Sequence, residues 1–109
     1  MVKQTAGRDN LGEFAPKFAE LNDDILFGEV WSRESELSAR DRSLITCASL
    51  LTQDVPQLEA HMKIAKQNGV TKTEMVEIIT HLAFYTGWPK AWSAFTLAKK
   101  IFGENEGGI

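Results

Sequence analysis

The sequence predicts an all-α fold, and three observations support that prediction. Apolar residues recur at helical spacing along most of the 109 residues. No segment alternates apolar and polar residues over the length of a strand. Residues that typically start and end helices separate the apolar segments at short intervals. We therefore expect one domain of six helices over residues 1–109, with flexible ends at residues 1–10 and 103–109.

The first two predicted helices are short. The first follows the apolar residues between positions 11 and 21, and Pro16 is early enough to belong to its first turn. The second covers residues 25–31, and Asp23 and Asp24 precede it as candidate caps. A hydrophilic segment then separates these helices from the rest of the chain.

The next two predicted helices are longer. Residues 39–53 follow Ser38 and are apolar around much of the helix circumference, which predicts a helix buried on several sides at the centre of the core. The fourth helix begins with Asp54 as its N-cap and Pro56 in its first turn. Asn68-Gly69 supplies its C-terminal stop.

The last two predicted helices start and stop at clear signals. Thr71 to Glu74 has the side chains of a capping box for the fifth helix, residues 72–86. Pro89 opens the sixth helix. Because the turn before the fifth helix is so short, we expect the fourth and fifth helices to lie side by side as a central hairpin. Phe84 gives the fifth helix a second apolar face, which predicts an oligomer built around this hairpin.

Composition and charge exclude several function classes. The net charge is −3, and basic residues are interspersed with acidic ones, so a nucleic-acid partner is not expected. Apolar runs are too short for a membrane span, and the N-terminus lacks the apolar core of a secretory signal, so we expect a cytoplasmic protein. Cys47 is the only cysteine, which excludes an internal disulfide or a CxxC metal or redox pair.

The two histidines are the best acid–base candidates. His61 falls within the apolar arc of the fourth helix, so it is either a general acid–base or a core histidine satisfied by one hydrogen bond. His81 lies at the border of the apolar stripe of the fifth helix and should be the more exposed. It is either catalytic or an interfacial histidine bonded to a carbonyl. One chain, or two copies, could bring both imidazoles to one pocket.

Other candidate residues have a structural and a functional interpretation. Cys47 lies on an apolar stripe and is read as a small buried hydrophobe, whereas a redox role would need a thiolate. Arg33 and Arg42 flank the entry to the central helix, where paired guanidinium groups suit a dicarboxylate, although each is also a normal surface residue. Three tryptophans are expected to be core or interface anchors, and only secondarily pocket walls: Trp31, Trp88 and Trp92.

Over about residues 27–102 the chain resembles the carboxymuconolactone decarboxylase family. The elements that carry the resemblance are Trp31-Ser32-Arg33, Arg42-Ser43-Leu44, His61 eight residues before Gly69, the start from Thr71 to Glu74, and Tyr85-x-Gly87-x-Pro89. The resemblance implies an all-helical subunit of the alkylhydroperoxidase D type, usually assembled into trimers or hexamers.

The sequence departs from the peroxidase members of that family. Those members carry a CxxC pair followed four residues later by a histidine. Aligning that histidine with His61 places the two cysteines on Asp54 and Gln57, and a proton-relay glutamate falls near Arg42. The dithiol peroxidase mechanism is therefore not expected, and Cys47, on the preceding helix, does not replace either cysteine.

The resemblance to the decarboxylase members implies a lyase that needs no cofactor and no metal. Its substrate would be a carboxylated lactone such as 4-carboxymuconolactone, in protocatechuate catabolism. The roles that follow are His61 as proton donor, His81 and Tyr85 orienting or polarising the lactone, Arg33 and Arg42 holding carboxylates, and Trp31 and Trp88 lining the pocket, with Trp88 excluding water. The alternatives are a reductase that uses Cys47 and a non-catalytic oligomeric binding protein.

Overall fold

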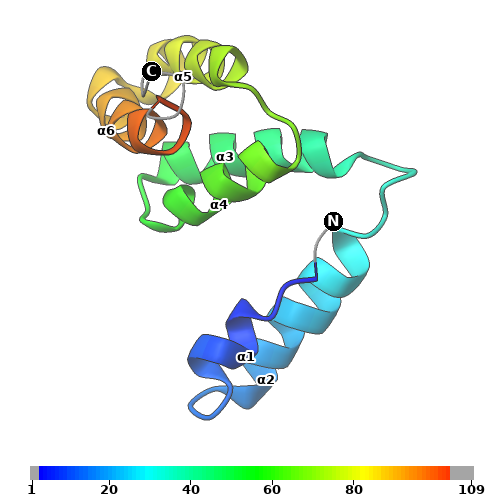
Figure 1. Ribbon diagram of the computed structural model, residues 1–109. Helices are drawn as coiled ribbons and strands as arrows, with labels where there is room; N and C mark the ends of the chain where they lie inside the picture. The colour runs from blue at the N-terminus through cyan, green and yellow to red at the C-terminus, as the bar shows by residue number, and fades with distance from the viewer. Residues whose placement is uncertain (1–2, 104–109) are drawn as a thin grey trace. The chain divides into compact units, whose positions relative to one another are not determined.

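The computed structural model describes residues 3–103, and every regular element in that range is a helix. This confirms the prediction of an all-α fold for the described part of the chain. The elements are α1 (Ala6–Leu11), α2 (Pro16–Glu20), the π-helical segment η1 (Leu21–Val30), α3 (Ala39–Gln53), α4 (Gln57–Gln67), α5 (Lys72–Thr86), α6 (Trp88–Ala98) and the π-helical segment η2 (Lys99–Gly103) (Figure 1).

The chain divides into two compact units, Met1–Ala39 and Arg40–Ile109. The first contains α1, α2 and η1, and the second contains nearly all of α3 together with α4, α5, α6 and η2. That the whole chain acts as a single domain stays a prediction.

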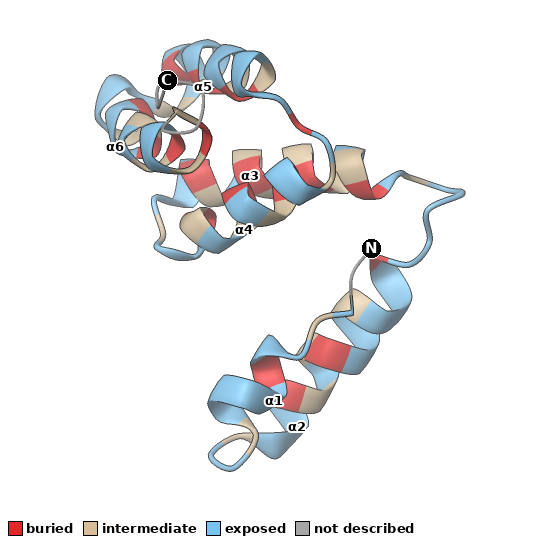
Figure 2. Cartoon of the chain, viewed as in Figure 1, coloured by how far each residue is buried: buried red, intermediate tan, exposed pale blue. Residues whose placement is uncertain are grey.

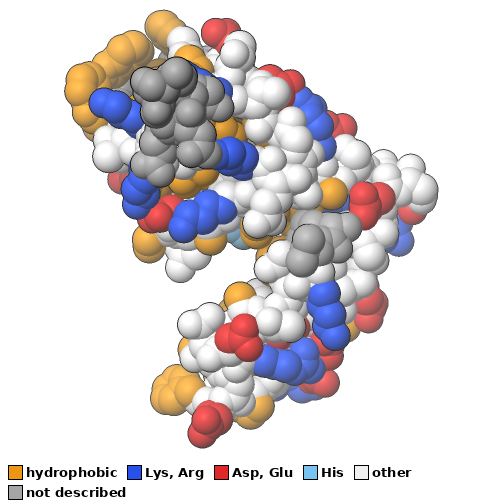
Figure 3. All heavy atoms as spheres, viewed as in Figure 1, with side chains coloured by type: hydrophobic (Ala, Val, Ile, Leu, Met, Phe, Trp, Pro, Cys, Tyr) orange, Lys and Arg blue, Asp and Glu red, His pale blue; other side chains and the backbone are white. Residues whose placement is uncertain are grey.

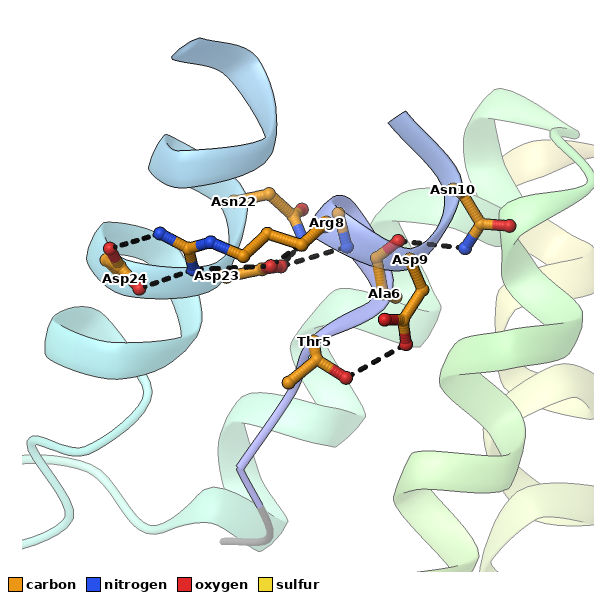
Figure 4. A network of polar contacts seen from close by, with 9 residues as sticks. Thr5, Ala6, Arg8, Asp9, Asn10, Asn22, Asp23 and Asp24 are labelled. Atoms are coloured by element: carbon orange, nitrogen blue, oxygen red, sulfur yellow. Dashed lines mark hydrogen bonds and ion pairs between the residues drawn. The ribbon is translucent and has the colours of Figure 1, made fainter. Parts of the chain in front are cut away.

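In the N-terminal unit, a buried aspartate at the start of η1 holds the first turn of α1. Asp23 accepts hydrogen bonds of 2.9 Å from the backbone N–H groups of Gly7 and Arg8 (Figure 4). These amides belong to the first turn of α1 and have no partner within that helix. The Arg8 guanidinium also donates two hydrogen bonds of 2.8 Å to the Asp24 carboxylate. A carboxylate at this end of a helix is favoured by the helix dipole.

Pro16 lies in the first turn of α2, as predicted. Two other predictions for this unit are wrong. Residues 6–10 are not a flexible end but part of α1. Asp23 and Asp24 do not cap a second helix, because α2 runs directly into η1. The physical reason is a contact across the unit: a Cβ on Gly7 would lie 2.7 Å from Asp23 Oδ1, so only glycine lets α1 pack this closely. At the other end, Gly103 lies within η2, and residues 104–109 are outside the described range.

The C-terminal unit contains a hydrophobic core to which all four of its helices contribute (Figure 2). The helix α5 buries one stripe at i, i+4 and i+8, formed by Met75, Ile79 and Ala83. The matching side of α6 is lined by small residues. The complete buried cluster is Cys47, Leu51, Leu58, Met62, Ala65, Val70, Met75, Ile79, Ala83, Ala91, Ala94, Ala98 and Phe102.

The main helix pair of this unit is α5 with α6, which corrects the expectation of a central hairpin made by the fourth and fifth helices. The helix α4 instead packs against α6 and η2. Small side chains at Ala91, Ala94 and Ala98 let α6 approach α5 closely. The chain reverses between them at Gly87, which has a φ of 104°.

Local signals at the helix ends were mostly predicted correctly. The capping box of α5 is present: Glu74 N–H donates to Thr71 Oγ1 at 3.1 Å, and Thr71 N–H donates to Glu74 Oε1 at 2.9 Å. The stop after α4 is also present, with Gly69 at a φ of 97°. Asp54 is the exception in the C-terminal unit. It has a φ of 57° at the end of α3, and Pro56 is the N-cap residue of α4.

Candidate active site

The half-buried histidine of the chain is His61 on α4. Buried neighbours of the same helix, Leu58, Met62 and Ala65, face the core, and His61 lies beside that face with its Nδ1 atom shielded from solvent. Burial lowers the pKa of His61, because the imidazolium loses hydration. The prediction that this side chain turns toward the interior is confirmed to the extent that it is half-buried.

The second histidine is exposed on α5, as predicted. Its ring lies 5.0 Å from the ring of Tyr85, measured between centroids, with an interplanar angle of 38°. The two residues are one helical turn apart, so the helix itself brings His81 and Tyr85 together. That they share a pocket with His61 stays a prediction.

The two predicted arginines lie in different units of the chain. Arg33 is exposed in the turn after η1, where its carbonyl accepts hydrogen bonds of 3.2 Å from the backbone N–H groups of Glu36 and Leu37. Arg42 is half-buried in the first turn of α3. That both arginines bind the carboxylates of one substrate stays a prediction.

The tryptophans have different environments. Trp31 is buried and stacks on Phe27, with a centroid distance of 5.7 Å and an interplanar angle of 24°. Trp88 and Trp92 are 60% and 70% exposed, so the expectation of core anchors is wrong for these two in the single chain. Their side chains project from a different side of α6 from the one that carries the buried alanines. Their alternative role as interface anchors stays a prediction.

Exposed aromatic side chains gather on the α5–α6 hairpin. Phe84, 78% exposed, makes an edge-to-face contact with Trp88 at 6.1 Å between centroids. Phe84, Trp88 and Trp92 follow one another at intervals of four residues, and Tyr85 is adjacent. We name these four residues the aromatic face. Its exposure agrees with the second apolar face predicted from Phe84.

Cys47 is a core residue. Its side chain is 2% exposed within the buried cluster, and burial raises the pKa of the thiol to about 11. At neutral pH the side chain is therefore a thiol and not the thiolate that redox chemistry requires. This confirms the interpretation of Cys47 as a small buried hydrophobe.

A cavity in the C-terminal unit was not predicted. It has a volume of about 870 Å³, and the residues that line it come from α5, α6 and η2. None of the predicted site residues lines it. Sequence reasoning missed it because its basic members, such as Lys72 and Lys99, read individually as ordinary surface residues.

The described residues 3–103 also bear on metal binding and membrane insertion. No group of three or more His, Cys, Asp or Glu side chains is placed to hold a metal ion in that range. No helix in the same range combines the length and apolar character needed to cross a membrane.

Comparisons with known proteins point to one family. Residues 16–100 match the model of the carboxymuconolactone decarboxylase family. The chain is 37% identical over 95 residues to 4-carboxymuconolactone decarboxylase of Acinetobacter baylyi, an alignment that covers 86% of this chain and 70% of that protein. It is 31% identical over 96 residues to nitrosuccinic acid decarboxylase npaB of Metarhizium robertsii, covering 87% and 66%.

A third relative has no described activity. An uncharacterized 15.0 kDa protein from the nqo9–nqo10 intergenic region of Paracoccus denitrificans is 29% identical over 86 residues, which cover 76% of this chain and 63% of that protein. The chain thus spans about two thirds of the length of these relatives.

Proposed function

Because the chain belongs to the carboxymuconolactone decarboxylase family, we propose that it is a cofactor-free lyase that decarboxylates a small carboxylated lactone. The specific substrate we propose is 4-carboxymuconolactone, consumed in the cytoplasm during catabolism of aromatic compounds through protocatechuate. The observation that carries this proposal is the 37% identity to a protein named for that reaction, over 86% of this chain.

Such a decarboxylation requires only a few groups from the protein. The bond between the ring carbon and the carboxylate breaks, carbon dioxide leaves, and the electron pair is delocalised into the lactone as an enolate. A proton is then added to carbon. The enzyme therefore needs a positioned acid and groups that stabilise the negative charge.

We assign the acid to His61. Its half-buried position shelters the proton from water, and a histidine whose pKa is lowered is a stronger acid once protonated. Arg33 and Arg42 are assigned to substrate carboxylates, because guanidinium groups bind carboxylates in a bidentate manner. His81 and Tyr85, which already contact each other, orient or polarise the lactone. Trp31 and Trp88 line the pocket, and Trp88 excludes water.

The names of two relatives support a common reaction type. One is a decarboxylase of 4-carboxymuconolactone and the other of nitrosuccinic acid. In each compound the electron pair left behind by carbon dioxide can move onto a neighbouring acceptor, a lactone system in one and a nitro group in the other. We therefore propose that this chain acts on carboxylates activated by an adjacent electron acceptor, with the lactone as the first choice.

We further propose that the active form is a trimer or hexamer. Phe84 and Trp92 of the aromatic face are largely exposed in the single chain, and burying them against another copy supplies the core that a chain of 109 residues has limited room to build. Packing of copies around α5 also puts His81 and Tyr85 next to the contact.

Neither alternative is favoured by an observation on the structure. The reductase would have to use Cys47, which is buried and protonated at neutral pH. A non-catalytic binding protein remains a distinct outcome of the experiment, since it would bind a carboxylated lactone without releasing carbon dioxide.

The decisive experiment is a decarboxylation assay on purified protein. Carbon dioxide release and the NMR spectrum of the product are measured with 4-carboxymuconolactone and, separately, with nitrosuccinate. His61→Gln should lower the rate by roughly 10²–10⁴-fold, the usual contribution of a positioned acid–base group, while His81→Gln, the matched control, should cost less. Arg33→Ala and Arg42→Ala should raise KM. Binding without turnover would identify a binding protein, and full activity of His61→Gln would remove the acid–base assignment.

A further inference from the structure

The unassigned cavity lies at the end of the α5–α6 hairpin opposite to Gly87. It is formed where the first turns of α5 meet the last turns of α6 and the segment η2. Its volume of about 870 Å³ falls within the range of roughly 300–1,000 Å³ typical of small-molecule sites. The lining residues differ from every residue assigned to decarboxylation, so the cavity is a separate site.

The floor of the cavity is apolar. Met75, Ala98 and Phe102 line it, and all three are buried members of the hydrophobic core. Phe95 and Val76 add apolar surface closer to solvent. A ligand body made of hydrocarbon would gain from contact with this floor, because it would remove apolar surface from water on both sides.

The rim of the cavity is basic. Lys72 from the start of α5 and Lys99 and Lys100 from η2 line it, and no acidic residue within 3–103 does so. Lys100 is already engaged, with its Nζ 2.9 Å from a carboxylate oxygen of Glu59. Lys72 and Lys99 form no ion pair within residues 3–103. Figure 3 shows basic and hydrophobic side chains on the surface of the C-terminal unit, with some acidic side chains among them.

We propose that this cavity binds an amphipathic monocarboxylate, with its hydrocarbon body on the Met75 and Phe102 floor and its carboxylate between Lys72 and Lys99. A neutral apolar ligand would leave the two ammonium groups without a counter-charge. A second copy of the chain placed symmetrically on this face would bring like charges together. A ligand with a hydrocarbon body and one carboxylate would pack on the apolar floor and pair with the lysines of the rim.

The test uses the full chain and octanoate as the probe, with 1-octanol as an uncharged ligand of the same chain length. Methionine methyl groups are labelled with ¹³C, so that the Met75 methyl reports the cavity floor and the Met62 methyl, in the core but not in the cavity lining, serves as an internal reference. Octanoate should shift the Met75 signal in a saturable way and leave Met62 unchanged. It should also bind more tightly than 1-octanol.

Two variants separate the charged and apolar contributions. Lys72→Gln combined with Lys99→Gln should weaken octanoate binding about tenfold and leave 1-octanol binding unchanged. The matched control, Lys63→Gln with Lys90→Gln, removes the same charge outside the cavity and should bind octanoate as the parent does. Thr96→Trp fills the cavity from its exposed rim and should abolish binding of both ligands.

Four results would overturn the proposal. The first is the absence of a Met75 shift with octanoate, and the second is an equal loss of binding in the control variant. The third is binding only after residues 104–109 are deleted, since the cavity would then belong to the segment that begins with Glu104. The fourth is a change of oligomeric mass in the Thr96→Trp variant, which would make the cavity a contact between copies. None of these results depends on whether the chain decarboxylates a lactone.

Discussion

At His61, shelter from water and proton exchange are linked. The same partial burial that protects the ring from solvent lowers its pKa, because the charged form loses hydration while the neutral form does not. The folded protein therefore binds a proton at this ring less readily than the unfolded chain does. A single side chain thus connects the pH dependence of stability to the proposed chemistry.

This link predicts how stability changes with pH. The contribution of neutral His61 should be complete above the pKa of an unfolded histidine, about 6.5, and should be lost as the pH falls toward the lower pKa of the folded state. Urea unfolding of the parent and of His61→Gln should therefore show a smaller fall in stability between pH 7.5 and 5 for the variant. Parallel curves for the two proteins would show that another group titrates.

Cys47, unlike His61, is buried in a way that removes its side chain from acid–base and redox chemistry at neutral pH. A thiol with a pKa of about 11 within the core has the volume of a small apolar side chain and almost no thiolate at neutral pH. Its position on α3 therefore matters for packing.

We predict that Cys47→Ala keeps decarboxylation within about twofold of the parent while lowering the free energy of unfolding by about 1 kcal/mol, the usual cost of a small cavity. Turnover and urea unfolding are measured on the same preparation. If the variant folds and assembles normally but loses hydroperoxide reduction that the parent shows, the reductase interpretation would replace ours.

At the scale of elements, the interactions that were predictable are those between neighbours in the sequence. The capping box of α5 joins residues three positions apart, and the boundaries of α3 and α5 follow from similarly local signals. The start of α1 depends on Asp23, which lies sixteen positions after Gly7. A pattern of neighbouring residues cannot predict a hydrogen-bond partner that far along the sequence. For that reason the short N-terminal helices were the least well predicted.

The packing at Gly7 gives a direct test. Gly7→Ala should destabilise the N-terminal unit by about 1–3 kcal/mol, because the new methyl group would meet Asp23 Oδ1 at 2.7 Å and the carbonyl oxygen of Ala19 at 2.8 Å. Hydrogen exchange at the amides of α1 reports the loss.

Gly28→Ala is the matched control for that variant. Gly28 lies in η1, and its nearest contact for a new Cβ is the carbonyl oxygen of Asp23 at 3.2 Å, so it should cost less. Equal effects of the two substitutions would mean that glycine flexibility, not the close contact at Gly7, governs α1.

The candidate site was predictable to the same extent as the helices that carry it. Helical spacing predicted that His61 is partly sheltered and that His81 is exposed beside Tyr85. The exposure of Trp92 was not predicted, because an apolar residue on a helix fits a core and a subunit contact equally well. The cavity between α5, α6 and η2 was not predicted, because three separate elements build it.

At the scale of the whole molecule, the exposed aromatic face is the feature that indicates an interaction surface. Apolar patches of this kind mark interaction sites on soluble proteins. We predict that light scattering at micromolar concentration finds a trimer or hexamer, and that Trp92→Glu shifts the population toward single chains by burying a charge in the contact.

Ser93→Glu is the control for this prediction. It places the same charge on the neighbouring exposed position of α6, about 100° around the helix from Trp92, and should leave the mass unchanged. A parent protein that is monomeric would remove the interface and any pocket shared between copies.

The turn at Asp54 also affects whether this fold could carry the dithiol chemistry of the peroxidase members. Resemblance to the peroxidase members places their two cysteines at Asp54 and Gln57, and both positions are exposed here, unlike Cys47. Asp54 has left-handed backbone, which aspartate tolerates better than most side chains. A variant of this chain with cysteines at these two positions would have to place its first sulfur on this unfavourable backbone or reshape the turn. Introducing the two cysteines alone would therefore not be enough, and the design of a dithiol variant would begin with the turn.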